Sequence, residues 1–281
     1  MYVKAKKALG QHFLKDQEIA ARIVNSLELS LQETLDKPNF KVNVLEVGPG
    51  TGVLTNFLIK NPQIELKLAE IDTESVEYLK IHYPQLGDSL IEGDFLQMEL
   101  NSLFKGEFML IGNFPYNISS QIFFKVLEYR EKVPQVVGML QKEVAERLAS
   151  PPGSKRYGIL SVLLQAWYDI EYLFTVNENS FIPPPKVKSA VIRVKRNSRV
   201  ELGCDQVLFK KIIKTTFNQR RKTIRNSIKP LISTLYNSNI PAGSLIIPES
   251  PLLAKRPEQL SVEEFVKLTL LVESTIKLNA N

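Results

Sequence analysis

The chain has 281 residues, 44% of them hydrophobic and 23% charged, which is ordinary for a globular protein and excludes a disordered, collagen-like or coiled-coil chain. Its formal net charge of +6 excludes little by itself, because the charges are unevenly placed along the chain. The longest nearly apolar stretch, residues 157–167, is too short to cross a bilayer, so we expect no membrane partner.

The first ten residues carry three lysines with no apolar core behind them, so no secretory signal is expected. Cys204 is the only cysteine, which excludes an internal disulfide and a cysteine-based zinc cluster. These features predict an intracellular, cytoplasmic protein without a metal site.

Up to about residue 200, short runs rich in β-branched residues alternate with amphipathic helical patterns. A first helix is expected over residues 17–27, with Asp16 as its N-cap. The predicted strands then cover residues 42–47, 64–71, 89–92, 108–112, 135–140, 171–176 and 190–195, and the predicted helices cover residues 75–81, 120–129, 142–148 and 159–167. This alternation predicts an α/β fold whose mostly parallel seven-stranded sheet carries helices on both faces.

The pattern changes after Arg199. Helical patterns cover residues 207–217, 221–235 and 262–274, residues 237–257 are rich in proline, and no strand is expected there. We therefore predict two domains, residues 1–199 and residues 200–281, of which the second is small and all helical.

Basic residues are concentrated in three windows that contain no acid. Residues 1–15, 181–200 and 210–229 hold four, six and eight Lys or Arg, which is 18 of the 36 in the chain. The remainder has 18 basic residues against 30 acidic ones. This distribution favours a polyanionic partner, most simply nucleic acid, although each window alone could be a solvated helix face.

Residues 44–55, Val-Leu-Glu-Val-Gly-Pro-Gly-Thr-Gly-Val-Leu-Thr, lead a buried strand into three glycines and then a helix. Gly48 and Gly50 permit tight turning and a close approach of the backbone to a ligand. Glu70 and Asp72 end the next strand about 20 residues later, where a carboxylate can accept both hydroxyls of a ribose. The spacing G-x-G-x-G departs from the dinucleotide fingerprint and favours S-adenosylmethionine over NAD, whereas the glycines alone could form a simple turn.

Asp94 follows the next predicted strand, within Glu-Gly-Asp-Phe-Leu. A carboxylate there can accept a hydrogen bond from the amino group of an adenine, with Phe95 against the ring. An Asp in this position is also common in ordinary turns.

The sequence Asn-Phe-Pro-Tyr at 113–116 directly follows an apolar strand. The Asn113 oxygen and a backbone carbonyl around Pro115 can accept the two hydrogens of an exocyclic amine, and Tyr116 offers a face on which a base can stack. The amine nitrogen is then directed at an electrophilic methyl group, and the proton can leave after transfer without a built-in general base. The alternative is a strand-to-turn junction stiffened by proline.

Six segments together resemble the ribosomal RNA adenine N6-dimethyltransferase family, and within it the small-subunit branch linked to kasugamycin sensitivity. The resemblance covers nearly the whole chain. It rests on Leu-Gly-Gln-His-Phe-Leu at 9–14, Glu-Val-Gly-Pro-Gly-Thr-Gly at 46–52, Asn-Phe-Pro-Tyr-Asn-Ile-Ser at 113–119, Leu-Gln-Lys-Glu at 140–143, Phe-Ile-Pro-Pro-Pro-Lys-Val at 181–187 and Phe-Asn-Gln-Arg-Arg-Lys-Thr-Ile-Arg-Asn-Ser at 217–227. The last segment separates the small-subunit enzymes from resistance methylases that act on large-subunit RNA.

The resemblance implies a Rossmann-like class I methyltransferase domain that binds S-adenosylmethionine and releases S-adenosylhomocysteine. It implies cofactor contacts from His12, Leu14, Gly48, Glu70, Asp94 and Asn113, to which the glycine loop adds Gly50. Most members of the family have Asn in place of His12, so an imidazole either replaces an amide there or only packs or caps the first helix. Phe181 is implied to sandwich a flipped adenine opposite Tyr116, although from the residues alone it could be a loop anchor.

RNA contacts are expected near both ends of the chain. Within residues 218–225, the cations Arg220, Arg221, Lys222 and Arg225 would open a helix, where they oppose the helix dipole unless a phosphate is nearby. Lys4, Lys6 and Lys7 are interpreted as a basic arm that reaches the same RNA.

The resemblance implies that the chain places two methyl groups on N6 of each of two adjacent adenosines near the 3′ end of 16S ribosomal RNA, with the small ribosomal subunit as its partner. We expect the chain to act as a monomer.

Two alternatives to this function stay open. One is an adenine N6-methyltransferase of large-subunit RNA or DNA, which residues 113–116 alone would fit. The other is an additional binding role in ribosome assembly.

Overall fold

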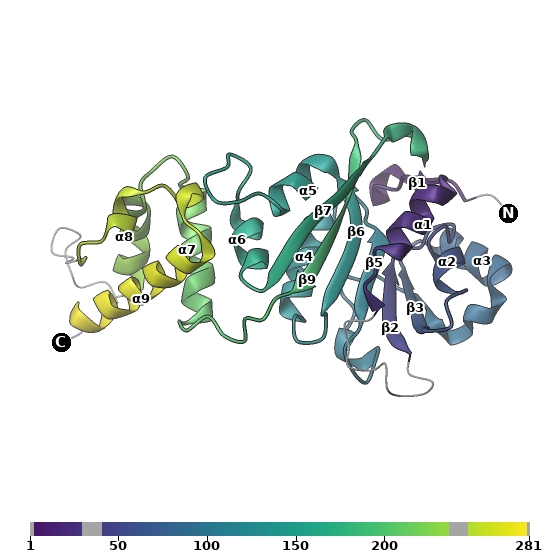
Figure 1. Cartoon of the computed structure of the whole chain (residues 1–281), viewed down its shortest axis with the longest axis horizontal. Helices are drawn as coiled ribbons and strands as arrows, with labels where there is room; N and C mark the ends of the chain where they lie inside the picture. The colour runs from purple at the N-terminus through teal and green to yellow at the C-terminus, as the bar shows by residue number, and fades with distance from the viewer. Residues whose placement is uncertain (1–2, 30–40, 236–246, 280–281) are drawn as a thin grey trace. The chain divides into compact units, whose positions relative to one another are not determined.

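The computed structural model of the chain describes residues 3–29, 41–235 and 247–279. The chain divides into two compact units, one made of residues 1–146 and 168–196 and the other of residues 147–167 and 197–281. Figure 1 shows the elements of both units. Within the described ranges, no helix is both long and apolar enough to cross a bilayer.

The first unit is built around a seven-stranded sheet in the order β4-β3-β2-β5-β6-β9-β7 (Figure 1). Its strands are β2 (Val42–Val47), β3 (Ile64–Glu70), β4 (Leu90–Glu92), β5 (Met109–Asn113), β6 (Gln135–Gln141), β7 (Tyr168–Val176) and β9 (Ser189–Arg196). The strands from β4 to β6 pair in parallel, and β9 pairs antiparallel with both β6 and β7. The predicted α/β fold with a mostly parallel sheet is confirmed, and every predicted strand is present within a few residues of its expected bounds.

The sheet is covered on both faces, which is why its central strands are buried along nearly their whole length. The helices of this unit are α1 (Gln17–Asn25), α2 (Thr55–Leu58), α3 (Thr73–His82) and α4 (Ser119–Glu128), while α5 (Lys142–Leu148) begins in this unit and ends in the second. On one face, Ile23 of α1 and Leu58 of α2 join a core that includes Val44 and Met139.

The opposite face carries the ring of Phe114. A Cβ atom added at Gly138 would lie 2.4 Å from this ring, so the strand can pass beneath it only as glycine. Phe123 of α4 packs edge-on against the same ring at 5.9 Å. Helix α4 therefore covers the face opposite α1 and α2.

Helix α1 begins where its sequence predicts. The Asp16 carboxylate accepts hydrogen bonds of 3.1 Å from the backbone N–H groups of Glu18 and Ile19, which otherwise have no partner in the first turn. Ala20, Ile23 and Val24 then lie three and four residues apart and are buried on one side of the helix. The predicted N-cap is confirmed.

Two very short strands were not expected from the sequence. The strand β1 (Phe13–Leu14) pairs antiparallel with β8 (Phe181–Ile182), so that Leu14 lies opposite Phe181. Runs of two residues are too short to show the alternation that identifies a strand. Their pairing fastens the amino-terminal segment to the turn before β9.

Among its described residues, the second unit contains helices joined by turns and no strand. It contains α6 (Ile159–Gln165), α7 (Gln206–Asn218), α8 (Ile224–Leu235) and α9 (Val262–Asn279). The Phe217 ring contacts the rings of Tyr157 and Phe265 at 6.3 and 6.0 Å, which joins α7 to α9 and to the segment before α6. Residues 147–167 thus pack with the second unit, whereas the predicted division placed them in the domain of residues 1–199. The functional division into two domains stays a prediction.

Candidate active site

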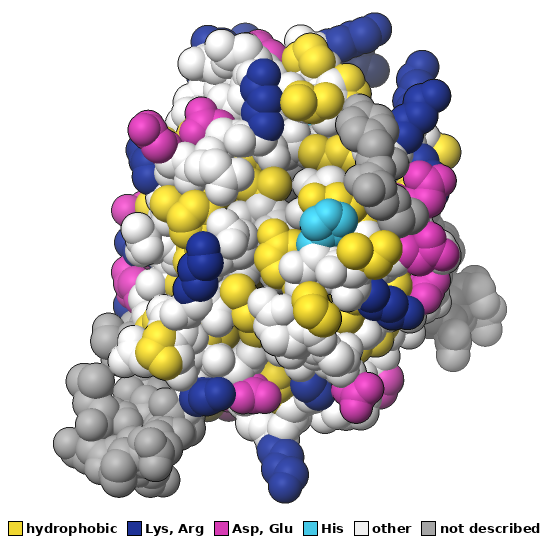
Figure 2. All heavy atoms as spheres, turned by 90° about the vertical axis from the view of Figure 1, so that its right-hand side faces the viewer, with side chains coloured by type: hydrophobic (Ala, Val, Ile, Leu, Met, Phe, Trp, Pro, Cys, Tyr) yellow, Lys and Arg dark blue, Asp and Glu magenta, His cyan; other side chains and the backbone are white. Residues whose placement is uncertain are grey.

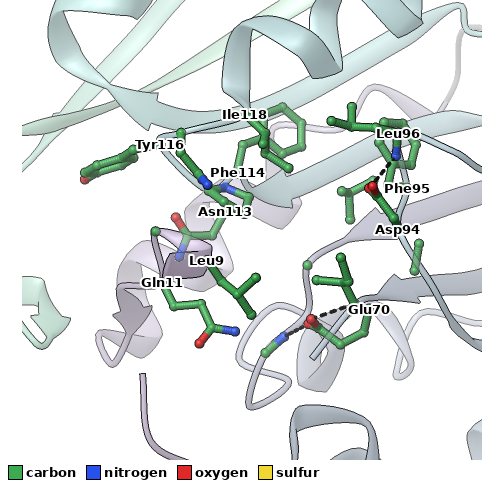
Figure 3. A pocket seen from close by; sticks show the side chains of 18 of the residues that line it. Leu9, Gln11, Glu70, Asp94, Phe95, Leu96, Asn113, Phe114, Tyr116 and Ile118 are labelled. Atoms are coloured by element: carbon green, nitrogen blue, oxygen red, sulfur yellow. Dashed lines mark hydrogen bonds between the residues drawn. The ribbon is translucent and has the colours of Figure 1, made fainter. Parts of the chain in front are cut away.

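A pocket lies at the carboxyl ends of β2, β3 and β5 in the first unit (Figure 3). This edge is where ligands bind in open parallel sheets, because loops there diverge and leave a crevice. The pocket is lined by residues 9–13, by Gly48 and Gly50 after β2, by Glu70 and Ile71, by residues 93–96 after β4, and by residues 113–118. The structure therefore brings together eight of the residues that the sequence singles out: His12, Gly48, Gly50, Glu70, Asp94, Asn113, Pro115 and Tyr116.

The glycine loop after β2 needs glycine at Gly50 for two reasons. Its φ of 58° lies in the left-handed region that residues with a side chain avoid. A Cβ atom there would also lie 2.8 Å from the Phe13 ring. The loop thus presents bare backbone to the pocket.

The carboxylate of Glu70 is buried and holds this loop in place. One oxygen accepts a 2.9 Å hydrogen bond from the Gly50 N–H, and the other accepts from the N–H groups of Ile71 and Asp72 at 3.0 and 2.9 Å. Burial raises the pKa of Glu70 even though the three hydrogen bonds act to lower it. A carboxylate has roughly four acceptor positions, so one is left for a hydroxyl of a bound ligand.

A second buried carboxylate, Glu46, lies in β2 below the glycine loop. It is 1% exposed and accepts a 2.7 Å hydrogen bond from the Thr55 hydroxyl. Burial raises the pKa of Glu46 to about 8, and the nearby Glu70 adds to the increase. No sequence pattern predicts a role for Glu46, because a carboxylate inside a strand gives no sign of its burial.

Asp94 lies across the pocket from Leu9 and Gln11 (Figure 3). Its Oδ1 accepts a 2.9 Å hydrogen bond from the Leu96 N–H, as in a typical Asx turn. Phe95 is only 4% exposed, so it forms part of the wall rather than an open stacking surface.

Lys125 of α4 holds the same turn from below, a role that no sequence motif indicates. Its Nζ donates to the carbonyl oxygens of Leu96 and Met98 at 3.0 and 2.5 Å. Lys125 is only 7% exposed, and its Nζ lies 5.4 Å from the centre of the Phe95 ring. Burial lowers the pKa of Lys125.

The amide of Asn113 has a fixed orientation. Its Nδ2 donates a 2.8 Å hydrogen bond to the backbone carbonyl of His12, an acceptor that can be satisfied only by the amide nitrogen. The Oδ1 is therefore the atom available to a ligand. The carbonyl of Pro115 accepts a 3.2 Å bond from the Ile118 N–H and keeps its second lone pair.

Tyr116 is held by its hydroxyl, which shares a 2.5 Å hydrogen bond with Ser189. Burial raises the pKa of Tyr116, so the phenol stays protonated at neutral pH. Its ring lies 5.3 Å from the ring of His12 at an angle of 34°. The Nδ1 of His12 lies 2.8 Å from the Pro183 carbonyl oxygen, so Nδ1 carries a proton and donates it to this oxygen.

Two predicted site residues lie outside this pocket. Leu14 and Phe181 face each other across the β1–β8 pair, and both side chains belong to the hydrophobic core, with 3% and 1% exposure. In this arrangement the Phe181 ring offers no face to a base stacked on Tyr116. Both side chains are buried in the hydrophobic core instead of facing the pocket, and no pattern in the sequence predicted this burial.

The donor and acceptor groups of the pocket fit S-adenosylmethionine. Bare glycine backbone, a buried carboxylate at the end of β3 and a carboxylate after β4 match a ribose and an adenine. The described residues contain no group of three or more side chains able to hold a metal ion.

Comparison with known proteins identifies the family. The sequence profile described as "Ribosomal RNA adenine dimethylase" matches residues 2–260. The chain belongs to this family. "Ribosomal RNA small subunit methyltransferase A" of Parabacteroides distasonis is 57% identical over 279 residues, which is 99% of this chain and 97% of the relative, and the protein of that name from Cytophaga hutchinsonii is 55% identical over 95% of this chain and 96% of its own length.

Solved structures agree with this assignment. A dimethyladenosine transferase from Plasmodium falciparum is 25% identical with a TM-score of 0.73, and the likeness covers 94% of this chain and 98% of that one. The 23S rRNA methyltransferase ErmE is 22% identical with a TM-score of 0.60 over 92% of this chain and 99% of its own, a likeness of fold. The fold is that of the class I S-adenosylmethionine-dependent methyltransferases.

For a family that acts on RNA, the placement of the basic residues matters, and the structure changes how they are interpreted. Lys6 of the expected basic arm forms ion pairs with Asp72 and with Glu74, whereas Lys4 and Lys7 are exposed. In the window 181–200, four of the six cations have carboxylate partners: Arg193, Lys195, Arg196 and Arg199. On the face shown in Figure 2, Lys and Arg side chains are scattered among acidic and apolar ones.

The cations of residues 220–225 also divide into two kinds. Arg220 lies 3.6 Å from Glu258, and Arg225 lies 2.6 Å from Glu249, while Arg221 and Lys222 are exposed and have no carboxylate partner among the described residues. The prediction that this run opens a helix at residue 221 is wrong. The chain turns at 219–223, and α8 begins at Ile224, so three of the four cations lie in the turn that precedes it.

Proposed function

We propose that this chain transfers methyl groups from S-adenosylmethionine to N6 of two adjacent adenosines near the 3′ end of 16S ribosomal RNA, giving N6,N6-dimethyladenosine during ribosome biogenesis. Membership of the adenine dimethylase family supports the reaction, and the names of relatives more than half identical support the small subunit as its substrate. We place this reaction in the cytoplasm and assign it to a monomer that uses no metal.

The observation that carries the proposal is the fixed amide of Asn113. Since the His12 carbonyl holds Nδ2, Oδ1 is presented to the pocket as a pure acceptor for one N6–H of adenosine. The second N6–H has the free lone pair of the Pro115 carbonyl within the same turn. Tyr116, anchored through Ser189, offers its ring face to the base.

The reaction then needs orientation more than acid–base chemistry. S-adenosylmethionine supplies a methyl group that its sulfonium makes electrophilic. Gly48, Gly50, Glu70 and Asp94 would hold it at the strand ends, and His12, with Nδ1 bound to Pro183, would border the place where base and cofactor meet. Two acceptors on the amine hydrogens direct the nitrogen lone pair at the methyl group, an advantage of about 7–11 kcal/mol in favourable intramolecular cases. The proton leaves after transfer.

The test is methylation of under-methylated small subunits with labelled cofactor, followed by mapping of the labelled nucleosides. We expect label on two adjacent adenosines of 16S RNA. Asn113→Ala should lower turnover on the order of a hundredfold or more while subunit binding stays near that of the wild type. Asn101→Ala, at an exposed position of the same unit, is the matched control and should behave as the wild type. Label on large-subunit RNA or DNA would overturn the proposal.

A further inference from the structure

Asp72 is a buried carboxylate that no step above uses. It directly precedes α3, its side chain is 1% exposed, and it accepts hydrogen bonds from three side chains. Lys6 donates its Nζ to Oδ1, while Gln11 and Ser75 donate to Oδ2 at 3.3 and 2.9 Å. Two of these three partners, Lys6 and Gln11, come from the amino-terminal segment more than 60 residues away.

That segment, residues 6–13, forms one wall of the pocket. Residues 9–13 line it, and Figure 3 shows Leu9 and Gln11 on the side opposite Asp94 and Phe95. Gln11 connects the start of the segment to Asp72. Its Oε1 accepts a 2.8 Å hydrogen bond from the Lys6 backbone N–H, and its Nε2 donates to the Asp72 carboxylate. Asp72 therefore holds this wall at two points.

Between these points, the Asn117 Nδ2 donates a long hydrogen bond of 3.5 Å to the Ala8 carbonyl, and the other attachments of the segment lie at its far end. The His12 carbonyl accepts from Asn113, and β1 pairs with β8. At Gly10 the backbone turns with a φ of 64°, and a Cβ atom there would lie 2.6 Å from Oδ1 of Asn117. Asp72 thus makes most of the side-chain contacts that hold residues 6–11, whereas residues 12–14 have anchors of their own.

The charges of Asp72 and Lys6 favour their ion pair at neutral pH. Burial alone would raise the pKa of Asp72, but hydrogen bonds from Lys6, Ser75 and Gln11 lower it, so the carboxylate is ionised at neutral pH. Lys6 also lies 3.2 Å from Glu74, and its pKa is raised, chiefly by the hydrogen bond to Asp72. A lysine engaged by two carboxylates is poorly suited to hold an RNA phosphate as well.

We propose that Asp72, acting through Lys6 and Gln11, is a positioning residue for the cofactor: it holds residues 6–13 as a wall over the pocket and slows the exit of bound nucleoside. This inference rests on the proposed function, since it takes S-adenosylmethionine and its product as the occupants. It also reassigns Lys6 from RNA binding to cofactor retention.

The experiment compares Lys6→Met and Asp72→Asn with Lys7→Met in the full chain. Lys7 is the matched control, because it is exposed and has no carboxylate partner among the described residues. The readouts are the dissociation constant and the dissociation rate of S-adenosylhomocysteine, and amide hydrogen exchange of residues 8–12. We expect both variants to bind the product about tenfold more weakly, mainly through faster release, with faster exchange in the segment. Lys7→Met and the conservative Lys6→Arg should match the wild type.

The double variant Lys6→Met/Asp72→Asn should bind S-adenosylhomocysteine no more weakly than the weaker-binding single variant, because both changes remove the same contact. Unchanged product affinity and exchange in Lys6→Met would overturn the inference, as would an effect seen only in the salt dependence of subunit binding. Since Lys6 is partly exposed, this variant keeps the test valid if Asp72→Asn fails to fold. A wild-type chain that binds no S-adenosylhomocysteine would instead contradict the proposed function.

Discussion

Glu70 shows how a single residue serves both the fold and the site. Its two oxygens bind three backbone N–H groups, from Gly50, Ile71 and Asp72, and thereby tie the end of β3 to the glycine loop after β2. The same carboxylate faces the pocket. We therefore expect a substitution of Glu70 to have two effects at once: it disturbs the glycine loop, and it removes an acceptor from the pocket.

We expect Glu70→Gln to weaken S-adenosylhomocysteine binding by about 1–3 kcal/mol, the range for a hydrogen bond to a charged group. The amide nitrogen of Gln would face a backbone N–H donor, so the loop loses one of its bonds as well. Calorimetric titration measures this, with Glu65→Gln as control, because Glu65 lies on the same strand but is 51% exposed. Equal affinity in Glu70→Gln and the wild type would remove Glu70 from the site.

Glu46 makes stability depend on pH. Its pKa is about 8 in the folded chain, above the ordinary value of 4.5, so the folded chain keeps a proton that the unfolded chain has released between these values. The contribution of Glu46 to the free energy of unfolding is greatest below pH 4.5 and falls as the pH rises from 4.5 to about 8, by up to about 1.4 kcal/mol per pH unit.

Glu46→Gln should remove this pH-dependent loss of stability, because Gln cannot ionise and still offers an oxygen to the Thr55 hydroxyl. Chemical denaturation at pH 5, 6.5 and 8 compares the two proteins. The wild type should lose stability relative to the variant as the pH rises, and parallel curves would mean that Glu46 is not protonated in the folded chain.

At the scale of elements, α4 supports the pocket from outside. Lys125 reaches from this helix to two carbonyl oxygens of the turn after β4, the turn that carries Asp94 and Phe95. Loss of the ammonium would leave both carbonyls without this donor while the helix remains packed on the sheet.

Lys125→Met should therefore raise the KM for S-adenosylmethionine several-fold with little change in kcat, because residues 113–116, which we propose bind the amine, lie on another loop. Lys80→Met, at an exposed position of α3, is the control. Steady-state kinetics at saturating RNA separates the two parameters. A fall in kcat alone would place Lys125 in a different role.

At the scale of the whole molecule, the two units offer a division of labour. The pocket belongs entirely to the first unit, and the exposed pair Arg221 and Lys222 belongs to the second. If RNA phosphates contact this pair, each lost contact lowers the slope of log affinity against log salt by about 0.7–0.9.

Replacing both Arg221 and Lys222 by Ala should weaken subunit binding and reduce that slope by about 1.4–1.8, with unchanged affinity for S-adenosylhomocysteine. Replacing Arg220 and Arg225 by Gln is the comparison, and its effect should be smaller because each already has a carboxylate partner. Binding measured at several salt concentrations distinguishes these outcomes. Parallel plots for the wild type and the first variant would mean that the turn faces solvent.

Hydrophobic periodicity and strand-end motifs were enough to predict the sheet and the convergence of its polar strand ends. Parallel strands alternating with helices need covered faces, so Glu70, Asp94 and Asn113, each at or just after a strand's carboxyl end, had to meet at one edge. Asp16 likewise marked the start of α1, because a cap depends only on the next few residues. These features are local or periodic, and local chemistry fixes them.

Tertiary structure alone decided what depends on partners distant in the chain. Lys6 pairs with Asp72 across 66 residues, and the β1–β8 pair draws Phe181 into the core, although neither contact leaves a periodic trace in the sequence. Windows without acid looked uniformly basic, yet acids from other strands and helices neutralise many of their cations, since an ion pair requires proximity in space rather than in sequence. The helix α6 joined the second unit for the same reason: its pattern predicts a helix but not which apolar surface covers it.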